Sequence, residues 1–338
     1  MIDLLVAGGG PAGLATAIHG ARVGLEVVVV ERRRGPVDKA CGEGLMPHAV
    51  RQLHGLGVDA PGSPFGGITY FDGRRCVTGR FRNGAGLGVR RTALHAALLD
   101  ATAAAGVKVV HGEVGEVSQD ATSVRCGDFQ ARYLAAADGL HSPIRTSLGL
   151  ARPSTGARRW GIRRHHSMTP WSDCVEVYWS ADAEAYVTPV ADDCVGVAIL
   201  TRRKGRFDEH LDGFPVLKDR LRGHSHGNDR AAGPLRQQVR NRTAGRVLLV
   251  GDAAGYVDAL TGEGIGIAFS AAALLVNCVA ADRPADYDRQ WRRMSRRYRL
   301  LTAGLLRAST YQPVRSRIVP AANHFPAIFT GLVNLLAD

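Results

Sequence analysis

The first thirteen residues constrain the fold more than any other part of the chain. Segment 8–13 reads Gly-Gly-Gly-Pro-Ala-Gly; it follows the apolar run 2–7 and precedes a stretch with helical periodicity. Glycines at these spacings let backbone amides approach a diphosphate closely, and the N-terminus of the following helix supplies partial positive charge. We therefore expect a strand, a tight turn and a helix that bind phosphate through Gly8, Gly10, Pro11, Ala12 and Gly13.

An acidic residue at a characteristic distance strengthens this interpretation. Glu31 lies eighteen residues beyond Gly13 and directly follows the second apolar run, 27–30. A carboxylate at the end of the second strand of such a unit is placed to accept hydrogen bonds from a ribose diol. The pattern predicts a dinucleotide-binding β-α-β unit in which Glu31 and the neighbouring Arg32 contact the cofactor.

Features of the termini and the cysteines bear on location. No charged leader precedes the first predicted strand, and removal of a signal peptide would destroy the glycine motif. No apolar run reaches the roughly eighteen residues needed to span a bilayer. The six cysteines form neither a Cys-x-x-Cys pair nor a zinc-binding pattern, which indicates reduced thiols. These features predict a cytoplasmic protein without a bound metal.

Basic residues outnumber acidic ones, with 43 Lys and Arg against 31 Asp and Glu and a formal net charge of +12. The arginines are scattered and have few aromatic neighbours, so no nucleic-acid partner is expected. The exception is segment 291–307, where arginines flank leucines. This segment is either a solvated helix face or a peripheral contact with an anionic membrane surface. The sequence does not indicate an oligomeric state.

Strand and helix patterns alternate along the rest of the chain. Helices are expected over 47–56 and 91–105, a polar helical region over 207–222, and helices from 264 to the end except near 313–320. Segment 66–89 has the Asp-Gly and Asn-Gly turns of short strands. The other expected strands are 107–110, 114–117, 123–126, 133–136, four between 158 and 201, and 246–250.

Two later segments each bring an aspartate to the end of a predicted strand. In segment 133–145, Asp138 begins a turn and Ser142 is expected to cap a short helix. In segment 245–266, Asp252 follows an apolar strand, and the turn Leu-Thr-Gly-Glu-Gly leads into a long helix. An aspartate suits a sugar or ribityl hydroxyl, and a helix N-terminus with free amides stabilises an anionic ring system.

With these three signatures in this order, the chain resembles the superfamily of FAD-dependent aromatic hydroxylases and geranylgeranyl reductases. This para-hydroxybenzoate-hydroxylase-like group also contains flavin-dependent halogenases. The helix start Arg-Thr-Ala-Leu at 91–94 is typical of it, and the resemblance spans residues 1 to about 275. It implies an α/β fold: a discontinuous Rossmann-like FAD-binding domain of glutathione-reductase type, an inserted β-sheet substrate domain and C-terminal helices.

The resemblance also implies domain boundaries and a reductant. The expected parts are an FAD-binding domain at 1–65, 90–152 and 236–280, a substrate domain at 66–89 and 153–235, and a C-terminal helical region at 281–338. FAD is the expected cofactor. NAD(P)H is expected as the reductant by the same resemblance. It would bind transiently and without a Rossmann domain of its own, because the chain has only one complete dinucleotide fingerprint.

Further contacts with FAD follow from the resemblance. Arg91 is expected near the phosphates or ribose, the backbone of Val114 at the adenine, and Asp252 at the phosphate–ribityl region. The amides of Gly264 and Ile265 are expected at the pyrimidine edge of the flavin. The remaining expected cofactor contacts are Asp138, Gly251 and Gly262.

The reaction is predicted from departures within that superfamily. The Cys-Gly-Glu-Gly turn at 41–44 is similar to geranylgeranyl reductases, but their Tyr-x-Trp-x-Phe-Pro strand keeps only its proline in segment 184–189. The Trp-x-Trp-x-Ile-Pro strand of halogenases is missing. We therefore expect a monooxygenase that hydroxylates a small apolar or phenolic substrate, such as an alkyl-phenolic lipid or polyketide, through a flavin C4a-hydroperoxide. The alternative is an FAD-dependent reductase of prenyl or polyene double bonds.

Three residues are candidates for a catalytic role. Cys41 is either a thiol next to the flavin or a buried structural cysteine. Glu43 either orients substrate or flavin or is a solvated turn residue, and Tyr186 either hydrogen-bonds the substrate or packs within a sheet. His165 and His166 are adjacent on a strand, so they point to opposite faces and cannot share a metal ion. They are interpreted as structural or surface residues, with one kept as a candidate phenol base.

Overall fold

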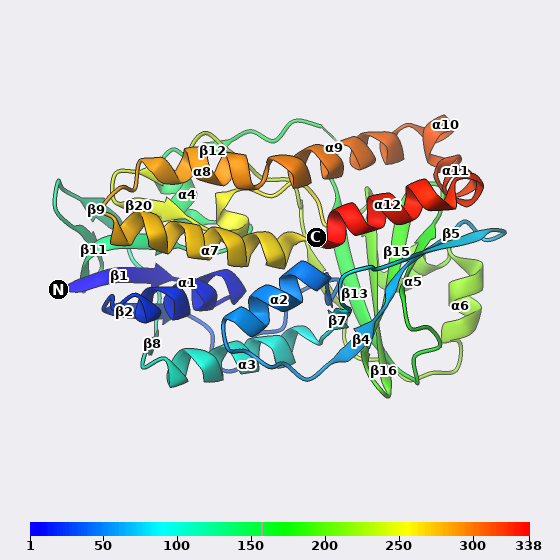
Figure 1. Cartoon of the computed structure of the whole chain (residues 1–338), viewed down its shortest axis with the longest axis horizontal. Helices are drawn as coiled ribbons and strands as arrows, with labels where there is room; N and C mark the ends of the chain where they lie inside the picture. The colour runs from blue at the N-terminus through cyan, green and yellow to red at the C-terminus, as the bar shows by residue number, and fades with distance from the viewer. Residues whose placement is uncertain (157) are drawn as a thin grey trace.

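The computed structural model describes residues 1–156 and 158–338, which form two sheet-containing lobes with helices along one edge (Figure 1). The strands of the first lobe are β1 (Ile2–Ala7), β2 (Val27–Glu31), β8 (Lys108–His111), β9 (Val117–Gln119), β10 (Val124–Cys126), β11 (Phe129–Ala136), β19 (Thr243–Ala244) and β20 (Val247–Leu249). Their order is β19-β20-β11-β1-β2-β8, with β10 paired to β11 and β9 to β10.

Parallel pairing in this sheet gathers the sequence signatures at one edge. β1 pairs in parallel with β2 and β11, and β11 pairs in parallel with β20. The carboxyl ends of these strands therefore meet, and in open α/β sheets ligands bind at that edge. The segments that follow β1, β11 and β20 contain Gly8, Asp138 and Asp252, and Glu31 is the last residue of β2.

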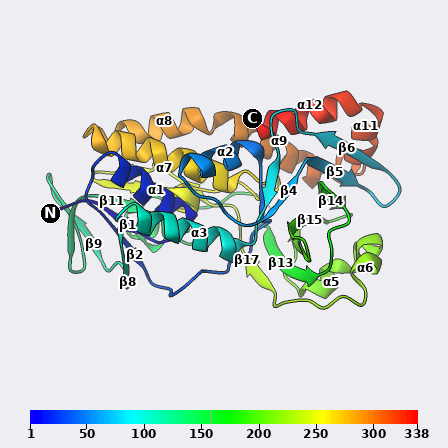
Figure 2. The same cartoon turned by 60° about the horizontal axis from the view of Figure 1, so that its bottom comes forward.

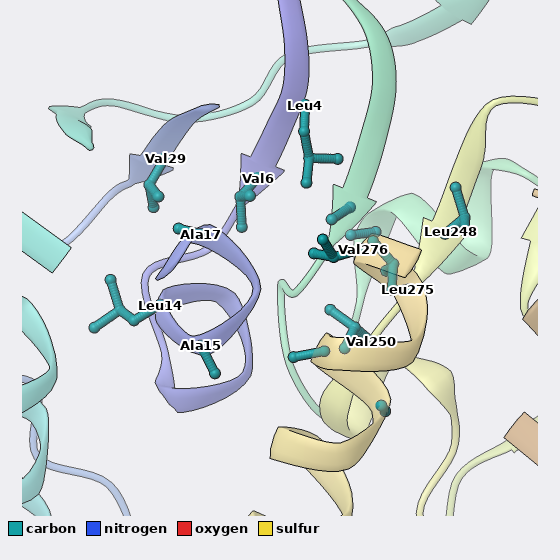
Figure 3. Close-up of a cluster of buried hydrophobic side chains, with 14 of the residues drawn as sticks. Leu4, Val6, Leu14, Ala15, Ala17, Val29, Leu248, Val250, Leu275 and Val276 are labelled. Atoms are coloured by element: carbon teal, nitrogen blue, oxygen red, sulfur yellow. The ribbon is translucent and has the colours of Figure 1, made fainter. Parts of the chain in front are cut away.

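Two helices pack against one face of this sheet and enclose its core. They are α1 (Pro11–Arg22) and α7 (Gly264–Ala280). Side chains from β1, β2, the β20 region and both helices converge there, including Val6, Ala17 and Val276 (Figure 3). The close approach depends on Gly13, because a Cβ added there would lie 1.9 Å from the carbonyl oxygen of Gly8. Helix α3 (Arg91–Ala104) also contacts α1.

A seven-stranded sheet forms the second lobe. Its strands are β5 (Gly67–Phe71), β6 (Cys76–Arg80), β13 (Trp160–Ser167), β14 (Val175–Trp179), β15 (Ala183–Ala191), β16 (Cys194–Thr201) and β17 (Arg230–Ala232). Their order is β17-β13-β16-β15-β14-β5-β6. Short helices α5 (Phe207–Leu211) and α6 (Pro215–Leu221) bury apolar side chains against this sheet. The predicted helical region 207–222 is thus two helices, and Pro215 begins the second because proline suits a first helical turn.

Small elements connect the lobes. They are β3 (Gly44–Leu45), β4 (Ser63–Phe65), β7 (Gly86–Gly88), β12 (Ala151–Arg152), β18 (Gln238–Val239), α2 (Pro47–Gly55), α4 (Pro143–Ser147) and the short 3-10 helix η1 (Gly251–Ala254). β7 pairs with β3 and β4, and β12 pairs with β18. The α/β architecture with a second, inserted sheet is confirmed, whereas the exact domain boundaries stay a prediction.

The C-terminal segment forms five helices among the described residues: α8 (Asp286–Met294), α9 (Arg296–Thr310), α10 (Gln312–Arg315), α11 (Ile318–His324) and α12 (Pro326–Ala337). α8 and α9 run along one edge of the molecule past both lobes (Figures 1 and 2). The expected break near 313–320 is shorter in the structure, because only residues 316–317 separate α10 from α11. Pro313 is tolerated in the first turn of α10. None of the described helices is long and apolar enough to cross a bilayer.

One strand is shifted from its predicted place. The apolar pattern at 114–117 predicted a strand there, but β9 begins only at Val117. The segment before it leads from β8 into the β9–β10 hairpin, whose register pairs Val117 with Cys126. This cross-strand register, rather than the local pattern, fixes where the strand starts.

Replacing Gly13 by alanine is expected to destabilise the first lobe, because the added methyl group would overlap the carbonyl of Gly8. Overpacking of this kind costs about 1–3 kcal/mol. Urea unfolding of the cofactor-free protein measures the change. Gly10→Ala is the matched control, since a Cβ added at Gly10 meets nothing within 4 Å. Equal stability of the two variants would show that the helix is not held by this contact.

Candidate functional site

The three sequence signatures pack directly on one another. A Cβ added at Gly8, which has a φ of 108°, would lie 2.5 Å from the carbonyl oxygen of Ala137. A Cβ added at Gly251, with a φ of 63°, would lie 2.7 Å from Cβ of Ala12. Both positions therefore need glycine. The turn after β1 is in this way held against the turns that follow β11 and β20.

The start of α1 offers a cradle for an anionic group. Gly10 is the N-cap residue and provides no side-chain cap, so the amides of the first turn have no side-chain partner there. A Cβ at Gly10 would project into open space. Free amides, partial positive charge and room beside the backbone fit a diphosphate.

Next to this cradle lies a pocket with a volume of about 360 Å³. The carboxylate of Glu31 is buried beside it; Oε2 accepts from the amide of Gly9 at 2.8 Å, and Oε1 accepts from the amide and Nε of Arg33. Burial opposes ionisation, but these hydrogen bonds outweigh it and lower the pKa of Glu31. The pocket is lined by Gly9, Glu31, Arg33, Arg34, Gly35, His95, Leu99, Val109, Val110 and His111.

Two residues expected at this end lie elsewhere. Arg32 is exposed and its Nη1 lies 3.7 Å from Oε1 of Glu113, while Arg33 reaches Glu31 instead. Val114 is not among the residues that line the pocket. The pocket is lined instead by the end of β8, including Val109 and Val110. Nothing in these contacts tests the cofactor roles expected for Arg32 and Val114, which stay predictions.

His95 connects the glycine turn to the segment around Val37 through hydrogen bonds. Sequence analysis did not identify this residue. Its Nδ1 accepts from the amide of Val37 at 3.1 Å, and Nε2 lies 2.6 Å from the carbonyl oxygen of Gly9. These partners fix a neutral ring that carries its proton on Nε2. Burial lowers the pKa of His95 in agreement with that state. The available signal was its position one turn into α3, four residues after Arg91.

Unpartnered polar groups mark the other end of the site. The side chain of Asp252 is exposed and makes no hydrogen bond to a described residue. Desolvation by the surrounding protein raises the pKa of Asp252, although the positive charges of Lys39, Arg91 and Arg145 lower it. Buried Nη1 of Arg91 and buried Oδ1 of Asp138 also have no partner. Such groups suit a ligand rich in hydroxyl and phosphate oxygens, and FAD satisfies this requirement.

The Asp138 turn supports the loop of Asp252. Ser142 caps α4 as predicted, its Oγ accepting from the amide of Arg145 at 2.9 Å. The guanidinium of Arg145 donates to the carbonyl oxygens of Asp252 and Ala253 at 3.3 and 3.2 Å. Arg145 therefore fixes the backbone of η1, a role that sequence analysis did not assign to it.

The turn before α7 faces the second lobe. Gly262 has a φ of 70°, and α7 begins at Gly264, so the amides of Gly264 and Ile265 lie in its first turn. The buried Glu263 precedes them; burial raises its pKa to about 8, with Arg297 opposing that shift. This geometry leaves helix-start amides available to a polar ring edge.

The Cys-Gly-Glu-Gly turn is held at the junction between the lobes. Glu43 has a φ of 60° and is buried, so its interpretation as a solvated turn residue is wrong. Its Oε1 accepts from the amide of Arg91 at 2.8 Å, and Oε2 lies 2.6 Å from Nε2 of His165. Burial, with the charge of Glu43 adding to it, raises the pKa of the Cys41 thiol. The thiol is therefore protonated near neutral pH.

The two adjacent histidines point to opposite faces of β13, as predicted. Both nitrogens of His165 are engaged, Nε2 with Glu43 and Nδ1 with Nη1 of Arg163 at 3.1 Å. His166 is buried against Phe207 and His226, and burial lowers its pKa to about 4. Both ring nitrogens of His166 are buried and have no hydrogen-bond partner among the described residues. The role of phenol base kept for one of the two histidines stays a prediction.

A cluster of packed apolar side chains lies between the second sheet, the turn before α7 and the C-terminal helices. Tyr186 of β15 packs in it, and its hydroxyl donates to the carbonyl oxygen of Leu260 at 3.0 Å. Burial raises the pKa values of Tyr186 and Tyr256 well above the usual range, so both phenols are neutral. The other members of this cluster include Phe65, Ile68, Tyr70, Phe81, Leu140, Trp179, Leu305, Ile318 and Val319.

Comparison with known proteins identifies the family to which the chain belongs. The family of the FAD binding domain matches residues 1–211. The chain belongs to this family and is an FAD-dependent oxidoreductase. The resemblance to aromatic hydroxylases and geranylgeranyl reductases is confirmed.

Curated relatives include both reductases and oxygenases. Menaquinone reductase of Mycobacterium tuberculosis is 28% identical, over 78% of this chain and 72% of its own length. Digeranylgeranylglycerophospholipid reductase 1 of Methanothermobacter thermautotrophicus is 27% identical, over 88% of this chain and 82% of its own length. Aurachin C monooxygenase/isomerase of Stigmatella aurantiaca is 26% identical, over 85% and 84%.

Solved structures share the fold at lower identity. A triple mutant of the flavin-dependent brominase Bmp2 superposes with a TM-score of 0.84 at 16% identity, covering 100% of this chain and 95% of that one. A flavoprotein/dehydrogenase from Cytophaga hutchinsonii gives a TM-score of 0.82 at 18% identity, covering 99% of this chain and 92% of that one.

Gly10→Ala is expected to weaken FAD binding without changing the stability of the cofactor-free protein. The added methyl group would occupy space that the diphosphate needs, whereas the φ of −73° at Gly10 suits alanine. Titration of the cofactor-free protein with FAD, followed by flavin fluorescence, measures the affinity. An unchanged affinity would show that the diphosphate of FAD does not bind at the start of α1.

Stability should fall in acid partly through His95. Its pKa is lowered on folding, so its contribution is present above about pH 6.5, the unfolded value, and is lost as the pH falls toward the folded value. The expected contribution to the slope is at most about 1.4 kcal/mol per pH unit. Urea unfolding of wild type and His95→Gln between neutral and mildly acidic pH measures it. Identical slopes would contradict the assigned role.

Proposed function

We propose that the chain is an FAD-dependent monooxygenase that hydroxylates an apolar, phenolic substrate. The observation that carries this proposal is the packed apolar cluster, with neutral tyrosine hydroxyls, beside the turn that starts α7. Its side chains would form the wall of a substrate chamber. Neutral phenols donate hydrogen bonds to a hydroxyl or carbonyl oxygen, and apolar walls exclude water from a reactive site. When bound, FAD supplies the two-electron chemistry and the reaction with dioxygen.

The chain's own residues supply position and electrostatics. We assign Gly8, Gly10 and Gly13 to the diphosphate, Glu31 to the ribose, and Asp252 to the ribityl hydroxyls. The first-turn amides Gly264 and Ile265 would favour negative charge on the nearby ring edge, because the N-terminus of a helix carries partial positive charge. Arg91 and Asp138, with unpartnered polar atoms, complete the proposed contacts.

Within the Cys-Gly-Glu-Gly turn, we assign Glu43 as a positioning residue. Its two carboxylate oxygens join the start of α3 to β13, and it needs a left-handed backbone between two glycines. Such backbone conformations cost free energy and persist where the surroundings fix them. Glu43 would thus hold Cys41 at a constant position relative to the flavin. NAD(P)H is proposed as the transient reductant.

Tyr256 is the chamber residue that we propose to contact the substrate directly. It lies on the loop between Asp252 and α7, and its hydroxyl makes no hydrogen bond to a described residue. Tyr186, in contrast, already donates to Leu260 and is better suited to holding that turn against β15. The candidate role predicted for Tyr186 is therefore proposed as structural support for the chamber.

A reductase of polyprenyl or quinone lipids is the second candidate. The relatives named menaquinone reductase and digeranylgeranylglycerophospholipid reductase favour it. The protonated Cys41 thiol also favours it, because saturation of a double bond requires a proton on the carbon that does not receive the hydride. The Cys41 thiol would deliver that proton and be reprotonated from solvent.

The two candidates make opposite predictions about oxygen. The purified holoenzyme is incubated with NADPH or NADH and a panel of alkylphenols, polyprenols and menaquinone, under air and anaerobically, and products are analysed by mass. For the proposed function we expect a product that gains one oxygen atom, labelled when ¹⁸O₂ is supplied, and no product without oxygen. A product that gains two hydrogens anaerobically would overturn it in favour of the reductase.

Two substitutions sharpen this test. Cys41→Ser is expected to leave hydroxylation largely intact but to slow double-bond reduction, because the serine hydroxyl is a much weaker acid than the thiol. Tyr256→Phe is expected to raise KM for a phenolic substrate by roughly tenfold, the loss of one hydrogen bond of about 1.4 kcal/mol. Tyr298→Phe is the matched control, because its hydroxyl donates to the carbonyl of Asp258 instead.

A further inference from the structure

The C-terminal helices present a surface that the cofactor site does not use. Of the eleven large apolar side chains that are exposed among the described residues, seven lie beyond residue 299. Exposed apolar groups gathered in one region of a protein surface mark an interaction site rather than random exposure. The seven residues are Leu300, Tyr311, Val314, Phe325, Ile328, Leu332 and Leu335.

Four of these side chains form one stripe along α12 and the residue before it. Phe325, Ile328, Leu332 and Leu335 are spaced three, four and three residues apart, which places them on one helix face. The stripe is well exposed: 61% for Ile328 and 49% for Leu332. The opposite face of α12 is buried against the β5–β6 hairpin. The stripe is therefore not needed to hold α12 in place.

The same region has an unusual charge. Segment 289–337 contains nine arginines and no aspartate or glutamate. Arg293, Arg296 and Arg307 are exposed and form no ion pair with any described residue. These arginines thus carry positive charge that the protein itself leaves uncompensated.

The arginines and the stripe lie side by side. Arg297 of α9 donates to the carbonyl oxygen of Leu335 at 2.6 Å, which ties α9 to the end of α12. α9 and α12 are neighbours in both views (Figures 1 and 2). On α9 itself, Arg296, Leu300 and Arg307 recur at helical spacing and are all exposed.

We propose that the outer face of α9–α12 docks on the anionic surface of a lipid bilayer. Its arginines would contact lipid phosphates, and the stripe 325–335 would enter the boundary between headgroups and acyl chains. A second copy of this chain is disfavoured, because a symmetric interface would bring the unpaired arginines of two copies together. Nucleic acid is disfavoured because the centre of the surface is apolar.

The docking face is also the outer side of the proposed substrate chamber. Leu305, Leu306, Ile318 and Val319 of the same helices contribute to the chamber's apolar cluster. On the outer side, Arg307, Tyr311 and Val314 border a groove of about 560 Å³. An apolar substrate dissolved in the bilayer would therefore meet the protein at the wall of its chamber. This consequence depends on the proposed function, whereas docking itself does not.

Vesicle co-sedimentation of the holoprotein tests docking without any activity assay. The vesicles are phosphatidylcholine alone or phosphatidylcholine mixed with phosphatidylglycerol. We expect binding only to the mixed vesicles, weakened by salt as surface charges are screened. Arg293→Gln/Arg296→Gln should weaken binding by about 25-fold, about fivefold for each arginine removed near the membrane. Arg125→Gln, on β10 of the first lobe, is the charge control and should bind as wild type.

The apolar stripe is tested in the same assay. Ile328→Gln/Leu332→Gln should abolish the binding that survives at high salt, while Val23→Gln/Val216→Gln, at other exposed positions, should not. Retained FAD absorbance and thermal unfolding show that each variant is folded. Absence of wild-type binding to mixed vesicles would overturn the proposal. Tighter binding to duplex DNA, or a dimer that the stripe variant dissociates, would also overturn it.

Discussion

The contact between Gly13 and the carbonyl of Gly8 is the constraint on which the rest of the structure depends. It sets the distance between α1 and β1, and therefore where the amides at the start of α1 point. Gly8 and Gly251 extend the same close packing to the turns after β11 and β20. Three segments far apart in the sequence are in this way joined into one cradle, because each junction excludes a Cβ.

The cradle is stabilised by groups that remain neutral or paired. Glu31 is fixed by Gly9 and Arg33, and His95 stays neutral between Val37 and Gly9. At the other end, polar atoms of Arg91 and Asp138 are buried without partners, a cost of about 1–3 kcal/mol for each such group. Among the described residues, folding thus leaves unsatisfied polar groups at the position where we propose that FAD would restore their hydrogen bonds.

Sequence reasoning predicted the α/β class, the inserted sheet and the elements that follow each signature, because glycine spacing and strand periodicity are local patterns. It also predicted the cap at Ser142 and the opposite directions of His165 and His166. It missed His95 and Arg145 and misread Glu43, since their partners lie far away along the chain. Burial of a charged side chain depends on which distant segments meet, and a single sequence does not reveal that.

The C-terminal helices also depend on contacts between segments far apart in the sequence. A buried network of charged side chains connects them to the second sheet and to the loop before α7. Arg315 of α10 donates to Glu184 of β15, which also accepts from Arg159. Nε of Arg159 lies 3.5 Å from Oδ2 of Asp258, in the loop between η1 and α7. All four side chains are buried. Breaking a buried ion pair by removing one partner costs about 3–5 kcal/mol. This network joins α10 to β15 and to the loop before α7. A displacement of α10 would therefore disturb both the proposed substrate chamber and that loop.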